Sequence, residues 1–303
     1  MNSPEGKPEV SMLQSALAAE FGMQVENLTS INPEDEGDNS EVFSGNYEGR
    51  KVFVKTSNDP QTFVLEVAGL ELFQKHGVPG PRTLIFKEYV KSINQSLMVQ
   101  TAAVGISLNR LSAERSVAGV YEEAGKMLKK IHDIKLEGFG TLRLNDGRLV
   151  GDTKSWKNYV LSSRPDVDLL KTKCFLTDQE IKILLAAREE IAHTKLGEAS
   201  FLHGDFQAPH IFTDGTGITG IIDLGGSSAG DPRNDIAKSH YFLQPENIPA
   251  FDRGYGNLAS DPLVTKHLLM TASRKVEYRI KHGFTRRVPK AIKKLKTIFS
   301  QMK

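Results

Sequence analysis

The hydrophobic pattern of the chain changes near residue 101, and this change limits the possible folds more than any other feature. Before that point, short runs such as Arg50–Thr56 alternate apolar and polar residues as strands do. After it, apolar residues recur mostly at helical spacing, as between Val117 and Ile131. We therefore predict an α+β, bilobal fold with a small β-rich N-terminal lobe (residues 1–101) and a larger α-helical C-terminal lobe (residues 102–303).

The N-terminal lobe is predicted to contain a hairpin, a prominent helix and further strands. Runs 41–47 and 50–56 are joined by Glu48-Gly49, which favours a tight turn. Asp59-Pro60 is typical of a helix N-cap followed by a first-turn proline, so a helix is expected from Pro60 to about His76. Two more strand-like runs follow, at Thr83–Tyr89 and Ser96–Thr101.

Composition excludes several classes of protein. The 303 residues are 39% hydrophobic and carry a net charge of +2, which argues against a disordered chain and against bulk electrostatic binding of nucleic acid. A single cysteine, Cys174, excludes an internal disulfide framework. No apolar run approaches the roughly 20 residues of a membrane span, and the N-terminus lacks a signal-peptide pattern. We expect a cytoplasmic protein with no membrane partner; its oligomeric state is left open.

The stretch Phe201–Ala237 places polar residues in apolar surroundings, among them Asp205, His210 and Asp223. Phosphoryl transfer needs a carboxylate near the attacking hydroxyl and oxygen ligands for Mg²⁺. Two β-like runs between the aspartates predict a hairpin, which would bring Asp205 and Asp223 to one site.

This stretch resembles the catalytic segment of the aminoglycoside phosphotransferase family, which includes choline kinases and macrolide phosphotransferases. The resemblance rests on His203-Gly204-Asp205, His210, Ile222-Asp223 and the run Gly230–Ala237, and extends over roughly residues 31–240. It implies a protein-kinase-like fold and transfer of the γ-phosphate of ATP or GTP to a hydroxyl of a small molecule. The family normally has Asn where this chain has His210, and macrolide phosphotransferases resemble it in carrying His there.

The resemblance also implies roles for individual residues. Asp205 would be the catalytic base, and Asp223 and His210 would hold Mg²⁺. The remaining expected residues serve the nucleotide: Lys55 would contact the α- and β-phosphates, Glu66 would fix Lys55, Ser40 would help to cover the phosphates, and backbone groups from Gln100 to Ala102 would bind the base.

Several alternatives stay open at this stage. An antibiotic-type acceptor, macrolide or aminoglycoside, is favoured, but a sugar or amino alcohol is another possibility. Because His210 is a poorer Mg²⁺ ligand than Asn, a nucleotide-binding pseudokinase that acts through partners is a second hypothesis. The basic run Arg274–Lys303 could bind nucleic acid, but we favour a solvated helix packed through Val288, Ile292, Leu295, Ile298 and Phe299.

Other polar residues are assigned to the scaffold. His203 and Asp235 are expected to hold the loop around Asp205, Asp231 to cap a helix, and His132 to be buried. The stretch Gly138–Trp156 reads as a loop-rich insertion, which would line the acceptor side together with the helices after Asp235.

Overall fold

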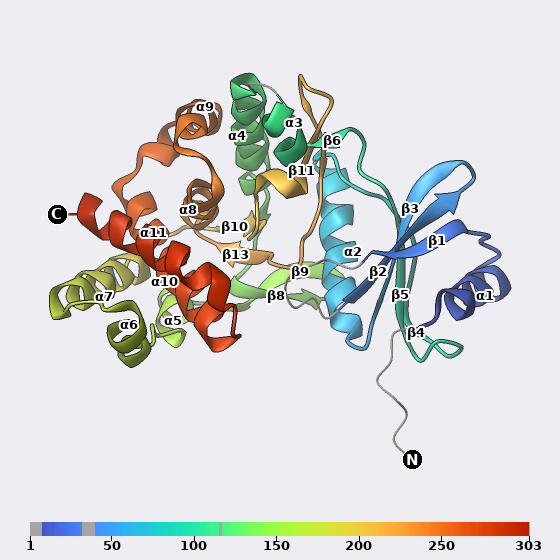
Figure 1. Ribbon diagram of the computed structural model, residues 1–303, viewed down its shortest axis with the longest axis horizontal. Coiled ribbons are helices and arrows are strands. Elements are labelled where there is room, and N and C mark those ends of the chain that lie inside the picture. Colours follow the sequence, from blue (N-terminus) through green and yellow to red (C-terminus); the bar gives the residue numbers. More distant parts are fainter. Residues whose placement is uncertain (1–7, 32–39, 115–116, 303) are drawn as a thin grey trace, which may run out of the picture. The chain divides into compact units, whose positions relative to one another are not determined.

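A computed structural model describes residues 8–31, 40–114 and 117–302. The chain divides into two compact units, one of residues 1–105 with 219–225, the other of residues 106–218 with 226–303. Figure 1 labels most of the helices and strands of both units. Within the described ranges, no helix has the length and apolar character that a bilayer crossing requires.

The first unit contains an antiparallel five-stranded sheet in the order β1-β2-β3-β5-β4. Its elements are α1 (Val10–Phe21), β1 (Glu26–Ile31), β2 (Ser40–Tyr47), β3 (Arg50–Ser57), α2 (Pro60–Lys75), β4 (Thr83–Val90) and β5 (Gln95–Thr101).

The predicted hairpin and helix of this unit are confirmed. Glu48 and Gly49 both have positive φ angles, 49° and 71°, which are those of a two-residue turn whose twist suits a hairpin. Asp59 caps α2 by accepting a hydrogen bond of 3.0 Å from the Gln61 amide, and Pro60 occupies the first turn. The buried side of α2 carries Phe63, so this helix is fixed at its start by the cap and along its length by the core.

The second unit is mostly helical. Its helices are α3 (Leu108–Glu114), α4 (Ala118–His132), α5 (Trp156–Ser162), α6 (Val167–Cys174), α7 (Asp178–Ala192), α8 (Pro232–Phe242), α9 (Ile248–Tyr255), α10 (Pro262–Lys281) and α11 (Val288–Gln301), with short 3₁₀ turns at Ala208–His210, Pro245–Asn247, Asn257–Ser260 and Thr285–Arg287. The expected α+β class, with strands first and helices later, is confirmed.

Short strands complete this unit. They are β6 (Ile106–Ser107), β7 (Lys135–Leu136), β8 (Phe139–Asn145), β9 (Arg148–Thr153), β10 (Ala199–Leu202), β11 (Ile211–Thr213) and β13 (Ser228–Gly230), while most of β12 (Ile218–Ile221) belongs to the first unit. Five of them form a sheet in the order β7-β10-β13-β8-β9.

The prediction of a loop-rich insertion at Gly138–Trp156 is wrong. Strands β8 and β9 pair as a hairpin across Asp146-Gly147, whose φ angles of 48° and 73° form a tight turn. The buried side chains of Leu142 and Leu149 supply the apolar face that holds the hairpin to the unit.

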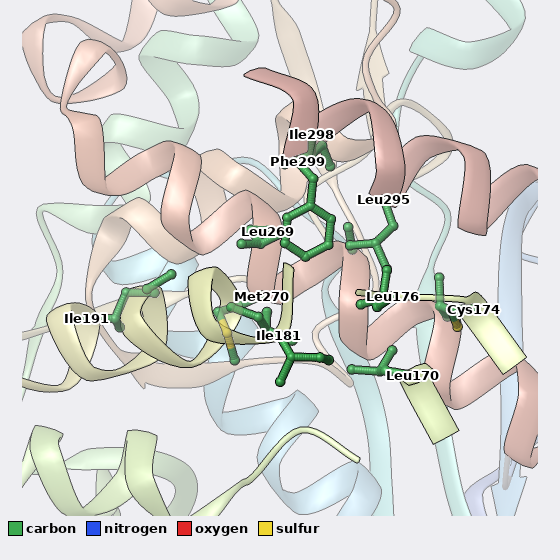
Figure 2. Close-up of a cluster of buried hydrophobic side chains, with 14 of the residues drawn as sticks. Leu170, Cys174, Leu176, Ile181, Ile191, Leu269, Met270, Leu295, Ile298 and Phe299 are labelled. Carbon is green, nitrogen blue, oxygen red and sulfur yellow. The ribbon is translucent and has the colours of Figure 1, made fainter. Parts of the chain in front are cut away.

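The core of the second unit lies among α5, α6, α7, α10 and α11. Figure 2 shows Leu295, Ile298 and Phe299 of α11 close to Leu269 and Met270 of α10. The predicted packing of the basic C-terminal helix through one apolar face is therefore confirmed for these three residues.

The chain's single tryptophan is part of this core. Trp156 is 5% exposed, and its indole N–H donates a hydrogen bond of 2.8 Å to the carbonyl of Ile191 at the end of α7. A Cβ added to Gly230 would lie 2.8 Å from the indole ring, so β13 can pass this close only because residue 230 is glycine. The tryptophan thus packs directly against the strand that leads into α8.

Candidate active site

The loop of residues 203–210 follows the buried strand β10 and makes a turn that only glycine allows. Gly204 has φ +82°, and a Cβ there would lie 1.8 Å from the carbonyl oxygen of Gly226. Backbone meets backbone at this point without an intervening side chain. The close approach fixes Gly226 against the residue that precedes Asp205.

A buried carboxylate anchors the same loop. Asp235 in α8 accepts hydrogen bonds from the backbone amides of His203 at 2.6 Å and Gly204 at 2.9 Å. His132 Nε2 lies 3.3 Å from the same side chain, and Tyr255 Oη lies 2.7 Å from His132 Nδ1. All of these groups belong to buried side chains or backbone, so the predicted loop-holding role of Asp235 and the buried position of His132 are confirmed.

The Asp235 carboxyl is held in its charged form. Burial by itself raises its pKa, but the contact with His132 and the charges of Lys238 and His203 outweigh burial, so the pKa lies below its ordinary value. A charged acceptor makes stronger hydrogen bonds to backbone amides than a neutral one does. The 203–210 loop is therefore fixed before any ligand arrives.

Asp205 is partly buried, with 27% of its side chain exposed, and has two polar neighbours on its own loop. Gln207 Nε2 donates a hydrogen bond of 2.8 Å to Asp205 Oδ2. The amide of Asp205 donates to His203 Nδ1 at 3.2 Å, which supports the structural role expected of the buried His203. Gln207 was not identified from the sequence, where no motif marks it.

The imidazole of His210 is oriented by the backbone. His210 Nδ1 lies 3.0 Å from the carbonyl oxygen of Asp205 and 3.4 Å from Asp205 Oδ2. A carbonyl oxygen can only accept, so Nδ1 carries the proton and a neutral ring has its lone pair on Nε2. This is the tautomer that can ligate a cation through Nε2.

Asp223 follows β12 and has a positive φ of 67°, which is uncommon for a residue with a side chain. Its Oδ1 accepts a hydrogen bond of 3.3 Å from the amide of Gly225, and the residue is exposed. Strained backbone positions of this kind occur often at functional sites.

Lys55 and Glu66, both assigned to the nucleotide, form an ion pair. Lys55 lies on β3 and Glu66 on α2, and Nζ is 2.7 Å from Oε1. Only 17% and 8% of the two side chains are exposed, so the pair is better shielded from water than a surface salt bridge. The arrangement holds an ammonium group in one place, as binding of a phosphate chain requires.

The structure describes fewer contacts for the other residues that were expected to bind the nucleotide. Gln100 is buried on β5, and its Oε1 has no hydrogen-bond partner among the described residues. The amide of Ala102 donates to the Lys51 carbonyl at 3.1 Å, so a bond from Ala102 to a base would use its carbonyl oxygen. Ser40 begins β2 opposite Ser57, but its side chain and residues 32–39 lie outside what the structure describes.

Helix α8 is capped and tied to the 203–210 loop. Asp231 accepts from the Arg233 amide at 3.0 Å, which confirms the predicted cap. Burial raises the pKa of Asp231, but His267 at 3.4 Å and the Arg233 guanidinium lower it by more. Further along the helix, Ser239 Oγ donates a hydrogen bond of 3.0 Å to the carbonyl of Phe206, a contact that the sequence did not indicate.

Residues 32–267 match the model of the phosphotransferase enzyme family (APH). The chain belongs to this family. The match covers the Lys55–Glu66 pair and the whole 203–210 loop with Asp223 and α8. The comparison with curated proteins gave no match.

Several solved structures share the fold of this chain. A thermostable mutant of aminoglycoside phosphotransferase APH(4)-Ia is 19% identical with a TM-score of 0.75, over 95% of this chain and 98% of that one. Macrolide 2'-phosphotransferase MphH from Brachybacterium faecium is 16% identical with a TM-score of 0.64, over 94% and 98%. A putative fructosamine-3-kinase from Thermobifida fusca is 15% identical with a TM-score of 0.64, over 96% and 99%. The expected protein-kinase-like fold is confirmed.

Proposed function

We propose that this family member transfers the γ-phosphoryl group of ATP or GTP to a hydroxyl group of a small molecule. The observation that carries the proposal is Asp205, a carboxylate on a loop whose backbone is fixed by a buried charge. Phosphoryl transfer depends mainly on positioning and electrostatics, so it is favoured by a catalytic carboxylate whose position is fixed before the substrates bind.

In the proposed reaction, Asp205 orients the acceptor hydroxyl and takes its proton. The hydroxyl oxygen forms a bond to the γ-phosphorus while the bond from that phosphorus to the β–γ bridging oxygen breaks. The nucleoside diphosphate leaves with the electron pair of the broken bond. Gln207 restrains one carboxylate oxygen of Asp205 through their hydrogen bond of 2.8 Å, which leaves the second oxygen for the substrate hydroxyl.

Lys55 would bind the α- and β-phosphates, with its position set by Glu66 at 2.7 Å. The backbone from Gln100 to Ala102 would bind the base, with the carbonyl groups as acceptors, and Ser40 would contribute to the phosphate cover. A cation held this way by a carboxylate is oriented before the nucleotide binds, so less entropy is lost on binding.

Asp223 and His210 are the proposed Mg²⁺ ligands, and Asp205 is the proposed catalytic base. The donor set of two carboxylates and one imidazole fits a divalent cation, although oxygen ligands suit Mg²⁺ better than nitrogen does. Three residues of chain, about 10 Å when extended, tether Asp223 to Gly226, which packs on Gly204. Bound Mg²⁺ would neutralise charge on the phosphates.

The acceptor is proposed to be of the antibiotic type, as the sequence favours. Two kinds of neighbour support this class, an aminoglycoside phosphotransferase solved with AMP-PNP and hygromycin B and a macrolide 2'-phosphotransferase. A metabolite acceptor, such as a sugar derivative, is supported by the putative fructosamine-3-kinase.

The test is nucleotide turnover with ATP or GTP, Mg²⁺ and a panel of macrolides, aminoglycosides, amino alcohols and sugars. Asp205→Asn is expected to lower acceptor-dependent turnover by about 10²- to 10⁴-fold while it leaves nucleotide binding intact. Asp214→Asn, which changes an exposed aspartate in the turn after β11, is the matched control and should keep full turnover. Undiminished turnover in Asp205→Asn would overturn the assigned role.

A nucleotide-binding pseudokinase is the second candidate, because an imidazole stands where the family pattern has an amide. It predicts nucleotide binding in calorimetry without turnover of any acceptor. It also predicts that His210→Asn creates activity where the unmodified chain has none. Turnover by the unmodified chain would exclude this candidate.

A further inference from the structure

The second unit contains a cavity that the proposed reaction does not use. It has a volume of ≈ 590 Å³ and lies among α8, the segment after α8, α10 and α11; we refer to it as the α8–α11 cavity. Pockets that hold small molecules commonly measure about 300–1,000 Å³. The space is therefore sufficient for an organic molecule of moderate size.

The charged side chains described around this cavity have one sign. Arg279, Arg287, Lys290 and Lys294 line it, and none of the described lining residues is an aspartate or glutamate. Among the described residues, no carboxylate lies within ion-pairing distance of Arg279, Lys290 or Lys294. Elsewhere on α11 a lysine does have a carboxylate partner, since Lys296 Nζ lies 2.8 Å from Glu180 Oε2.

Lys294, which lies in this cationic cavity, contacts an aromatic ring and a backbone carbonyl. Its Nζ lies 4.5 Å from the centre of the Tyr241 ring and donates to the Tyr241 carbonyl. Burial, with the nearby charge of Lys290, holds the pKa of Lys294 below its ordinary value. An anion in the cavity would counteract both effects, because it would favour the charged form of the lysine.

The remaining lining is largely apolar and is continuous with the core. Phe242, Leu243 and Ile248 contribute to it, and so does Ile298, which Figure 2 shows within the buried cluster. A ligand that fits both parts would have an apolar body and an acidic group. Inorganic anions alone would leave the apolar part of the cavity unfilled.

We propose that the α8–α11 cavity binds a small organic anion, an apolar skeleton that carries a carboxylate, sulfate or phosphate group. His240 lines the cavity, and Ser239, which precedes it in α8, donates a hydrogen bond from its hydroxyl to the Phe206 carbonyl in the 203–210 loop. If the anion is the acceptor of the proposed phosphoryl transfer, it takes the place of the antibiotic-type acceptor proposed above; otherwise it is a separate effector that binds along α8. In either case the cavity selects against a polycation, because like charges would be brought together.

Three fluorescent probes with one common skeleton test the charge preference: dansylglycine (anionic), dansylamide (neutral) and dansylcadaverine (cationic). Dansylglycine is expected to bind at least about tenfold more tightly than the other two, with an affinity that falls as salt is added. Equal binding of the three probes, or tighter binding of the cation, would overturn the proposal.

Two lysines of α11 provide the variant and its control. Lys290 lines the cavity and Lys293 does not, and both are exposed, so neither change to Gln should disturb the fold. Lys290→Gln is expected to weaken dansylglycine binding about three- to tenfold, and Lys293→Gln to leave it unchanged. Equal effects of the two variants would show general surface attraction and would overturn the site.

Turnover measurements distinguish the two sources of the anion. Hydroxy acids are compared with their amides as acceptors under the conditions of the activity test. Turnover confined to the acids identifies the anion as the acceptor, whereas anion binding with turnover of neutral compounds identifies an effector. Probe binding needs no turnover, so a chain without phosphotransferase activity would still show the charge preference, and the two proposals can fail separately.

Discussion

The two ends of α8 differ in whether their charged side chains have partners of opposite charge. Near its start, the buried Asp235 carboxylate contacts two backbone amides and His132. At its end, Arg279, Lys290 and Lys294 line the α8–α11 cavity, and none of the three has a carboxylate within ion-pairing distance among the described residues. Removal of one partner of a compensated buried charge is costly, because the remaining groups stay buried without that partner. An uncompensated cluster costs folding energy, and binding of an oppositely charged ligand offsets that cost.

The largest loss of stability is expected from removal of the Asp235 carboxylate near the start of α8. Asp235→Ala removes the acceptor from two buried amides and is expected to lower the free energy of unfolding by about 3–5 kcal/mol, measured by urea denaturation. The control is Asp133→Ala, which removes an exposed carboxylate paired with Lys129 and should cost less than about 1 kcal/mol. Similar costs in the two variants would contradict the anchoring role of Asp235.

The same end predicts how stability depends on pH. The folded-state pKa of Asp235 lies below its ordinary value of 3.8, so the unfolded chain binds the proton more readily. The stability that Asp235 contributes is present above the ordinary value and is lost as pH falls through the folded-state pKa. Unfolding measured between pH 6 and pH 2 should show a decline on the acid side, and Asp235→Asn should make that decline shallower. An unchanged slope in the variant would assign the acid loss to other groups.

The close approach at Gly204 gives the next effect. In Gly204→Ala the Cβ would overlap the Gly226 carbonyl at a positive φ, and a loss of about 2 kcal/mol or more is expected. Gly217→Ala is the matched control, since nothing lies within 4 Å of a Cβ there. Thermal unfolding of both variants measures the difference, and a stable Gly204→Ala protein would show that the two glycines can separate.

The smallest changes in stability are expected from substitution of two lysines of α11, one paired with a carboxylate and one not. Lys296→Gln removes the partner of Glu180 and should cost about 0.5–1 kcal/mol. Lys290→Gln removes a cation from the uncompensated cluster and should leave stability unchanged or raise it by a few tenths of a kcal/mol. Urea denaturation at low salt tests the pair, and a larger loss in Lys290→Gln would mean that Lys290 has a stabilising role of its own.

How far the sequence could predict this molecule depends on how local each feature is. The Asp205 loop and the capped starts of α2 and α8 are encoded in short segments, so spacing and turn chemistry reveal them. The β8–β9 hairpin was missed although Asp146-Gly147 is a common hairpin turn, because the many glycines of that stretch resembled a loop.

Contacts between segments that are far apart in the sequence could not be predicted from spacing and turn chemistry. Ser239 bonds to Phe206 from 33 positions away, and the cavity draws its cations from two helices and the turn between them. The seven residues 219–225 group with the first unit, where the Ile221 amide donates to the Pro79 carbonyl at 2.9 Å. Each of these depends on how helices and strands pack, which periodicity alone does not specify.

The packing of Trp156 supplies a built-in signal for unfolding. It is the chain's single tryptophan, and it is buried in the second unit against Gly230, one residue before the Asp231 cap of α8. Tryptophan emission therefore follows the melting of the helical unit alone, whereas circular dichroism follows both units. If the two signals change at different urea concentrations, the β-rich unit and the helical unit unfold as separate cooperative blocks, and coincident changes would show that they unfold together.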